Sequence, residues 1–266
     1  MKFNKDIFIK EATDFLLNCP MNKIEKLDDL IIYDKVIFGF ASSEDKLFEQ
    51  LKKEKAIGPN HRTPKEWMPE GRTVISYFLS FSKRVRESNR IGELPSTEWL
   101  YGRIEGELMN LEMKKFIIKE LEKMGVTAIA PTMDKDFRVE NRKSNWSERH
   151  VGYVAGLGTF GLSESIITKL GAAGRVGSVI TSLEIEPTHR AYSGIYEYCL
   201  WYRDGSCGKC IKRCPANAIS EKGKDKDLCA GFVDMTKEKY DPRYGCGKCQ
   251  TGVVCENRNV LLRKED

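Results

Sequence analysis

This sequence lacks the features that would place it in a membrane or a secretory route. No run approaches the ~18 consecutive apolar residues that a membrane-spanning helix needs. The opening segment MKFNKDIFIKEATDFLL mixes acidic residues among its apolar ones and has no small-residue cleavage site, so it is not a signal peptide. We therefore expect a cytoplasmic protein without a membrane partner, in a compartment where thiols stay reduced.

Cysteine is almost missing from most of the chain. Cys19 is alone in the first 198 residues, and the other eight of the nine cysteines lie between Cys199 and Cys255. A disulfide framework is typical of small secreted domains, whereas 266 residues with 41% apolar and 31% charged side chains describe an ordinary globular chain. The clustering indicates metal, and we expect Cys19 to be a plain buried thiol.

One cysteine is also missing from the run SCGKCIKRCP. The bacterial ferredoxin run is Cys-x2-Cys-x2-Cys-x3-Cys-Pro, and here Asp204 stands at its first position. In two-cluster ferredoxins the cysteine before the proline ligates the other [4Fe–4S] cluster. Applying this rule predicts two clusters, with Cys199 in place of the missing ligand. The first would hold Cys199, Cys207, Cys210 and Cys255, and the second Cys214, Cys229, Cys246 and Cys249.

Two alternatives for these cysteines stay open. The pairs Cys207/Cys210 and Cys246/Cys249 have the spacing of a four-cysteine zinc ribbon. Zinc leaves the Cys-Pro step and three further cysteines without a role. The other alternative is one cluster with spare thiols.

The chain divides into two regions of different character. Residues 1–197 alternate helical and strand patterns and predict a layered α/β or α+β domain, whereas residues 198–266 have little periodicity and must be organised by metal. No internal repeat or low-complexity linker is present. We expect strands at 35–41, 73–81, 126–130 and 176–185, and helices at 6–17, at 44–54 with Ser43 as cap, from Ser96-Thr97 to a stop at Gly125, and at 146–155.

The densest basic patch is Lys83, Arg84, Arg86 and Arg90. It would either contact phosphate or be a solvated loop. The loop histidines His61 and His189 are expected to be structural.

The stretch AGLGTFG contains a Gly-x-Gly-x-x-Gly pattern. A dinucleotide fingerprint should follow a strand and open a helix, but the preceding NWSERHVGYVA has a helical pattern. We reject the Rossmann interpretation. These glycines would let the backbone turn tightly or approach a large flat group.

The order of PEGRTVISYFLSF, ERHVGYVAGLGTFGLSESIIT, GRVGSVITSLEIEP and the cysteine region with YGCGKCQ resembles epoxyqueuosine reductase and, more distantly, the reductive dehalogenases. The resemblance covers about residues 60 to 258. It implies an α+β fold: a nitroreductase-like α/β sandwich at 1–197 that holds a corrinoid, followed by a small ferredoxin-like two-[4Fe–4S] domain at 198–266.

The resemblance also implies the partners and the cofactor site. Clusters would pass electrons from an external ferredoxin or flavodoxin to cobalamin, which reduces a small-molecule substrate. The residues that would line the cobalamin are Ala155, Gly156, Leu157, Gly158, Thr159, Gly161, Gly174, Arg175, Gly177 and Ser178. No Asp-x-His-x-x-Gly motif is present to supply a lower ligand.

Three departures from the family pattern bear on the substrate. The family's catalytic aspartate falls in register on Arg142, and no aspartate lies between Asp136 and Asp204. The sequence ends 11 residues after Cys255, so we expect a short form without the helical-repeat tail implicated in tRNA binding. The first cysteine of the run is displaced to Cys199. tRNA is therefore not the expected partner, although it is not excluded.

Glu148, His150 and Tyr153 are candidates to replace the aspartate as proton donor, because they lie on the helix before the glycine stretch. Each also has an ordinary structural role, Glu148 as a solvated charge and the other two as half-buried hydrogen-bonded residues. The preferred function is a cluster-dependent, corrinoid-dependent reductase. The alternatives are an electron-transfer protein that activates a partner, and a flavin-containing variant.

Overall fold

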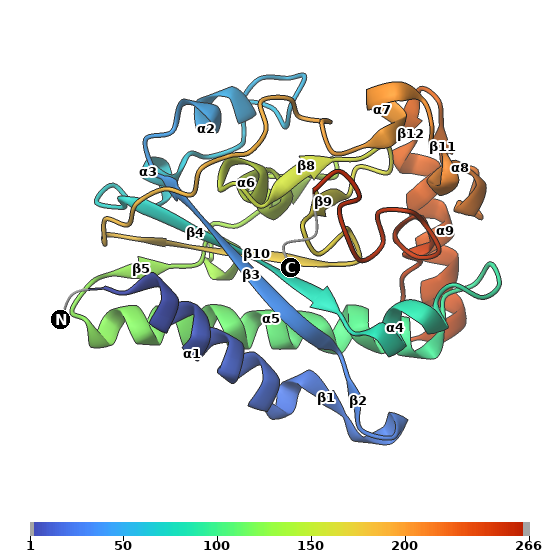
Figure 1. Cartoon of the computed structure of the whole chain (residues 1–266), viewed down its shortest axis with the longest axis horizontal. Helices are drawn as coiled ribbons and strands as arrows, with labels where there is room; N and C mark the ends of the chain where they lie inside the picture. The colour runs from blue at the N-terminus through green and yellow to red at the C-terminus, as the bar shows by residue number, and fades with distance from the viewer. Residues whose placement is uncertain (1–2, 263–266) are drawn as a thin grey trace.

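The protein is described here by a computed structural model covering residues 3–262. Its centre is a four-stranded antiparallel sheet in the order β3-β4-β10-β5 (Figure 1). These strands are β3 (Tyr33–Ser42), β4 (Thr73–Phe81), β10 (Gly174–Thr181) and β5 (Ala128–Ile129). All nine residues of β4 are buried because the strand is covered on both faces. Fold class is therefore mixed helix and sheet, as expected.

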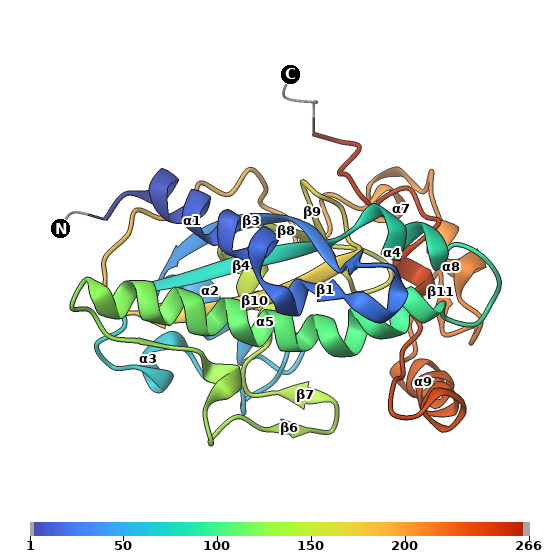
Figure 2. The ribbon, with the colours of Figure 1, turned by 90° about the horizontal axis from the view of Figure 1, so that it is seen from below.

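Two long helices cover one face of the sheet. They are α1 (Lys5–Asn18) and α5 (Thr97–Lys123), and both lie along the same side in Figures 1 and 2. Alternate residues of β4, such as Ile75, Tyr77 and Leu79, point into the core that they form. Ser96 caps α5 by accepting from the backbone N–H of Trp99, which confirms the predicted start of this helix.

The opposite face of the sheet carries a shorter helix and a small hairpin. Helix α6 packs on β4 and β10, and the hairpin β8–β9 packs against α6. Val74 and Ile180 of the sheet join Trp146, Val151 and Val154 in this second core. The bounds are α6 (Glu148–Val154), β8 (Gly158–Phe160) and β9 (Ile166–Thr168).

Smaller elements complete the first part of the chain. Helix α4 corrects one expectation, because the basic patch at its start is helical and not a loop. The helix predicted at 44–54 is shorter than expected, and Asp45 caps it in place of Ser43. The elements are α2 (Lys46–Leu51), α3 (Pro64–Trp67), α4 (Lys83–Ser88), β1 (Lys23–Ile24), β2 (Leu30–Ile31), β6 (Val139–Glu140) and β7 (Lys143–Ser144).

We call residues 3–197 the sheet body and residues 198–262 the cysteine region. The cysteine region contains a helix that its sequence did not predict, α9 (Lys226–Tyr240), which Asp225 caps. The others are short: α7 (Leu200–Asp204), α8 (Lys209–Arg213), β11 (Ile219–Ser220) and β12 (Gly223–Lys224). Figure 1 shows α7, α8 and α9 together at one end of the sheet. The two-domain division stays a prediction.

Among the helices of residues 3–262, none is both long enough and apolar enough to cross a bilayer.

Candidate functional site

Four cysteines surround a small apolar cavity at the outer end of the molecule. They are Cys199, Cys207, Cys210 and Cys255, and they are the four assigned to the first cluster by sequence. Cys199 is the N-cap of α7 and is 8% exposed, so the thiol displaced along the chain is buried in the wall of this cavity. Leu162, Ile167 and Val253 are among the side chains that line the same cavity.

A second cavity, about 180 Å³ in volume, is lined by the other four cysteines. Cys214 follows α8, Cys229 lies in α9, and Cys246 and Cys249 flank Lys248 in the loop that follows. Helix α9, which the sequence did not predict, places Cys229 next to the three cysteines that other segments contribute.

The thiols within each set lie close enough to affect one another's ionisation. Burial, with smaller contributions from the first-set thiols Cys210, Cys199 and Cys207, raises the pKa of Cys255 to about 12. Burial likewise raises the pKa of Cys246 to about 12, with contributions from the second set. Because the thiolate is the metal-binding form, iron would have to displace protons from these groups.

The donor set of each cavity fits an iron–sulfur cluster. Four thiols per cavity is the [4Fe–4S] complement. The zinc-ribbon pairs Cys207/Cys210 and Cys246/Cys249 line different cavities. Within the part of the chain that is described, no three Cys, His, Asp or Glu side chains converge as ligands of a single ion.

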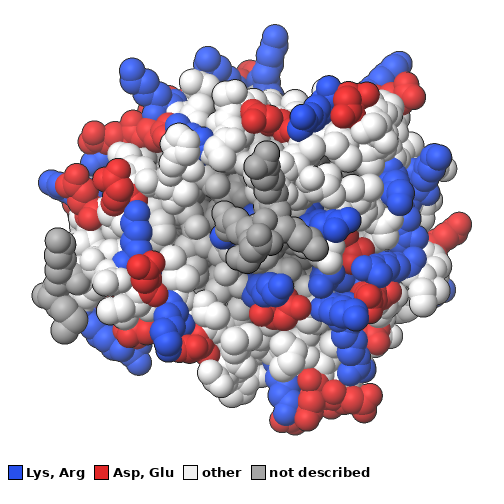
Figure 3. All heavy atoms as spheres, in the orientation of Figure 1, with Lys and Arg blue, Asp and Glu red and all other residues white. Residues whose placement is uncertain are grey.

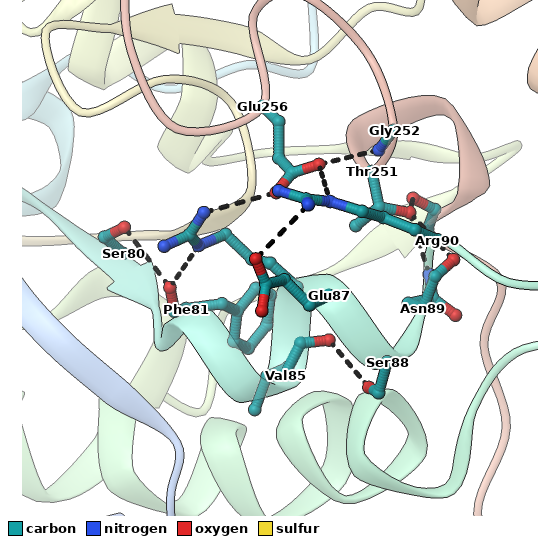
Figure 4. Close-up of polar contacts among 12 residues, drawn as sticks. Ser80, Phe81, Val85, Glu87, Ser88, Asn89, Arg90, Thr251, Gly252 and Glu256 are labelled. Atoms are coloured by element: carbon teal, nitrogen blue, oxygen red, sulfur yellow. Dashed lines mark hydrogen bonds and ion pairs between the residues drawn. The ribbon is translucent and has the colours of Figure 1, made fainter.

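A buried charge cluster fastens the loop that carries three of these cysteines. Glu256 is 2% exposed; its carboxylate accepts from Arg86 at 3.2 Å, from Arg90 at 2.7 and 3.0 Å, and from the backbone N–H of Gly252 at 2.6 Å (Figure 4). Burial alone would raise the pKa of Glu256, but these hydrogen bonds outweigh it and lower the pKa. Two residues of the basic patch, Arg86 and Arg90, therefore hold the cysteine loop, whereas Lys83 and Arg84 are exposed.

A second anchor lies beside the first. Lys248 is fully buried between the second-set cysteines Cys246 and Cys249, and its ammonium donates to the carbonyls of Asn89 at 2.9 Å and Ile91 at 2.8 Å. The Asn89 amide in turn donates to the carbonyl of Cys246 at 3.0 Å. The segment after α4 and the cysteine loop thus satisfy each other's buried polar groups.

A cavity of about 480 Å³ lies next to the second cysteine set, a size typical of ligand pockets. Cys246, Gly247 and Gln250 line both this cavity and the cysteine cavity, as do Arg103 and Arg149. The two spaces therefore share a wall. None of the residues that line the first-set cavity lines the 480 Å³ cavity, so the second set is the inner one.

Glu148 is held inside this cavity by three polar neighbours. Ser178 donates to its Oε2 at 2.5 Å, Lys114 lies 3.2 Å from its Oε1, and Thr132 donates to Oε1 at 3.3 Å. The Lys114 side chain is 1% exposed and that of Glu148 is 17% exposed. Burial raises the pKa of Glu148, and Lys114 and Ser178 counter this only in part. Glu148 is thus not the solvated helix charge that its sequence position also allowed.

A second ion pair crosses the same cavity. Arg175 pairs with Glu107 at 2.5 Å and also donates to the Tyr33 hydroxyl at 3.1 Å and the Arg103 carbonyl at 2.7 Å. The buried Tyr33 ring stacks on Phe81 and joins this pair to the core. These three partners hold the Arg175 guanidinium in one position at the cavity wall.

The other two donor candidates lie away from this cavity. The His150 ring accepts or donates at Ser147 Oγ, 2.8 Å away, and packs on Phe160, and burial lowers its pKa to about 3. Tyr153 is 6% exposed and stacks on Tyr192, whose hydroxyl donates to the Tyr153 carbonyl at 2.6 Å. Of the three, Glu148 alone is among the residues that line the 480 Å³ cavity.

The predicted cofactor residues are divided by the structure. Gly174 and Arg175 line the 480 Å³ cavity, whereas the stretch 155–161 lies on the other side of α6 and only Gly161 of it borders the first-set cavity. Gly156 has φ +87°, as a tight turn requires. At Gly158 a Cβ would lie 2.0 Å from the Ile167 carbonyl oxygen, so the flat partner here is β9 of the chain itself.

Sequence reasoning missed the polar residues of α5 that face the cavity. Lys114 and Asn110 are buried among the apolar Met113 and Ile117 on the sheet-facing side of this helix. The sequence did contain a sign of this site, because Asn110 and Lys114 are four residues apart on the apolar face of the predicted helix. Polar residues on such a face are seldom buried without a partner.

A larger cavity of about 640 Å³ lies elsewhere, between residues 54–66 and the β6–β7 hairpin. It contains no cysteine and none of the predicted site residues. Arg142, which stands in register with the family's aspartate, is on this hairpin and pairs with Asp227 of α9.

Comparisons with known proteins agree with these features. No family model matches the chain. An epoxyqueuosine reductase of Bacillus anthracis is 26% identical over 262 residues, covering 85% of this chain and 63% of the relative. The resemblance is confirmed. A tetrachloroethene reductive dehalogenase of Desulfitobacterium hafniense is 33% identical over 111 residues, or 39% of this chain and 19% of the relative. The chain thus spans less than two thirds of the first relative's length.

Solved structures show the same fold. The epoxyqueuosine reductase of Streptococcus thermophilus superimposes with a TM-score of 0.57 at 17% identity, over 98% of this chain and 69% of the neighbour. A reductive dehalogenase described as performing B12-dependent dehalogenation gives 0.52 at 15% identity, over 76% and 27%. An epoxyqueuosine reductase with an epoxyqueuosine-modified stem loop of tRNA gives 0.51 at 18% identity, over 95% and 66%.

Proposed function

We propose that this chain is an iron–sulfur reductase. Each set of four cysteines holds one [4Fe–4S] cluster, and the 480 Å³ cavity beside the inner set holds the group or substrate that is reduced. The proposal rests chiefly on one observation: the eight cysteines line two separate cavities, four in each, and Cys246 also borders the larger cavity. When bound, such clusters supply one-electron transfer.

The residues of the shared wall prepare the inner site. Arg103 and Arg149 border both the second cysteine set and the cavity. A cluster with four thiolates carries net negative charge, so guanidinium groups at this wall favour its binding and its reduction. They also leave the cavity positive enough to receive an anionic part of a ligand.

Glu148 is the proton donor in this proposal. Its raised pKa keeps the proton on the carboxyl more readily than a solvated glutamate would, and its position in the cavity wall lets it reach a bound ligand. Ser178 and Lys114 orient the carboxyl, and Lys114 compensates the charge after the proton leaves.

A corrinoid or a flavin would occupy the cavity in this proposal. The flat ring of either suits a space of this size lined by Phe78, Trp99 and Gly174. The nucleotide tail of a whole cobalamin would extend out of it. Arg175 and Arg103 are placed to contact polar groups at the ring's edge.

The similar proteins suggest which substrate classes to test first. The relatives are named for epoxyqueuosine, and one neighbour was solved with a tRNA stem loop, so a nucleoside-type substrate is the first to test. In this chain Arg142 stands at the position that corresponds to the family's aspartate. In this proposal Glu148 donates the proton in place of that aspartate. A small organic substrate is the second to test.

Anaerobic reconstitution tests the cluster part of the proposal. We expect about eight irons and eight sulfides per chain. Cys199→Ser should lose about half of the iron, while Cys19→Ser, outside both sets, should lose none. Zinc without iron in the native protein, or eight irons in Cys199→Ser, would contradict the assignment.

Cofactor titration then tests the cavity. The reconstituted protein is titrated with cobalamin and, separately, with flavin, and the spectra are followed. Glu148→Gln should retain the clusters and the cofactor response yet lose substrate reduction by about 10²- to 10⁴-fold, and Glu148→Asp should recover part of it. Clusters without any cofactor response would favour the electron-transfer alternative.

A further inference from the structure

Exposed aromatic side chains lie on the surface next to the first cysteine set. Two exposed aromatic rings, Tyr196 and Tyr202, stack there with centroids 4.2 Å apart, and they are 40% and 44% exposed. Tyr202 lies beside the first set, since it belongs to α7, which begins directly after Cys199. Val260, 38% exposed, lines the first-set cavity itself.

The surface around these rings is basic. The segments 200–213 and 257–262 expose four cationic side chains, Arg203, Lys209, Lys212 and Arg258. Three carboxylates lie near the rings, and each is engaged within the chain. Asp204 accepts a hydrogen bond from the backbone N–H of Ser206 at 2.9 Å, Glu197 accepts from the backbone N–H groups of Ser193 and Gly194 at 3.0 Å, and Glu164 pairs with Lys226 at 3.8 Å. Figure 3 shows Lys and Arg side chains along the edge of the molecule where α8 and α9 lie. Apolar rings within a basic rim are the composition of a protein-docking surface.

The position of this surface gives it a role. The first set shares no lining residue with the 480 Å³ cavity, whereas the second set borders it. Helix α8 contains Cys210 of the first set and ends at Cys214 of the second, and it packs against residues 248–250, which include Cys249, so the two sets are neighbours. A reductant that arrives from solution therefore meets the first set first.

We propose that this surface, formed by α7, α8 and the segment 257–262 with Tyr196, docks a small acidic electron-carrier protein. The inference rests on the proposed function. The carrier gives up one electron and the first cluster gains one, with no bond formed or broken. The basic rim steers an acidic partner and the tyrosines supply the apolar contact, so affinity should fall as salt rises.

The test uses the reconstituted full chain and an acidic flavodoxin. Its oxidised form is used for calorimetric binding and its fully reduced form for stopped-flow reduction of the clusters. Lys209→Glu with Lys212→Glu should weaken binding by roughly 10-fold or more at low salt, with the difference shrinking at high salt. Reduction by dithionite, which needs no docking, should not change.

The matched control reverses two exposed lysines far from this surface, Lys46→Glu in α2 and Lys119→Glu in α5, and should change binding less than about 2-fold. Equal weakening by both pairs, unchanged binding in the docking pair, or no complex with the native protein overturns the docking proposal while leaving the clusters intact. If the lysine pair impairs iron retention, Arg203→Glu and Tyr202→Ala provide the same readout. A native protein that holds no iron contradicts the proposed function instead.

Discussion

The sheet body and the cysteine region are stabilised by different means. The body has apolar cores on both faces of β4, with side chains such as Ile75, Leu79 and Met109 fully buried. The second of these cores extends into the cysteine region through Tyr198, Cys199 and Ile219. Among the described residues of the cysteine region, five apolar side chains are buried: Tyr198, Cys199, Ala218, Ile219 and Val253. In α9 the one buried residue is Thr236. A segment of this length cannot offset its chain entropy with so little apolar burial.

Polar anchors supplement this limited apolar burial in the cysteine region, and the proposed clusters would add to them. The Glu256 cluster, which is drawn in Figure 4, and the Lys248 cluster tie the loop of Cys246, Cys249 and Cys255 to α4 and the residues that follow it. The backbone N–H groups of Ala172 and Ala173 donate to carbonyls of the same loop. Contacts with the body therefore position this region, and in the proposed function the two clusters complete it.

Iron removal should have the largest effect. Anaerobic chelation is expected to lower hydrogen-exchange protection of the α9 amides by on the order of 10-fold or more, while β4 amides keep theirs, because metal binding supplies folding free energy only to the cysteine region. Mass spectrometry of peptides from the two regions measures this. Equal protection of α9 with and without iron would show that the region has a stable fold of its own.

Breaking the buried charge cluster comes next. Glu256→Gln removes the carboxylate that pairs with the buried Arg86 and should cost about 3–5 kcal/mol, measured by denaturant unfolding. Glu87→Gln in α4 removes an exposed carboxylate that pairs with the exposed Arg90, and it should cost less than about 1 kcal/mol. Similar losses of unfolding free energy for the two variants would show that the buried Glu256 cluster contributes no more than an exposed ion pair.

A matched pair of leucines compares the two regions directly. Leu79→Ala removes a fully buried side chain of β4 and should cost about 2–5 kcal/mol of unfolding free energy. Leu228→Ala in α9, at a side chain 52% exposed, should change it by less than about 0.5 kcal/mol. A large loss at Leu228 would reveal a core in the cysteine region.

Mild acid should weaken the body. Its buried His61 has a pKa lowered by burial to about 4, so below pH 6.5 the unfolded chain takes up a proton that the folded chain does not. Protonation of His61 in the unfolded chain therefore does not reduce the unfolding free energy above pH 6.5. As the pH falls to about 4, it lowers the unfolding free energy by about 3 kcal/mol in all. Unfolding free energies of native protein and His61→Gln across this window measure it. His189→Gln, in an exposed loop, should leave the dependence unchanged.

Local patterns predicted the body well. The apolar run Thr73–Phe81 is β4 residue for residue, and Ser96 caps α5 as expected. The final strand was misplaced, since β10 runs from Gly174 to Thr181 and not from 176 to 185. Gly174 and Arg175 gave no strand signal because their strand conformation comes from pairing with Ser80 and Leu79 of β4. Helix α9 was missed because its sequence places no apolar stripe against a core.

The division of eight thiols into two groups of four could be predicted from the covalent sequence alone. Cysteine count, the Cys-Pro step and the gap at Asp204 are properties of the covalent chain, and they divide the thiols into the same two groups of four that line the two cavities. Only the tertiary structure decided which polar groups face the neighbouring cavity. Lys114, Glu148 and Ser178 come from three elements, and their contact depends on how α5, α6 and β10 pack, which no local pattern records.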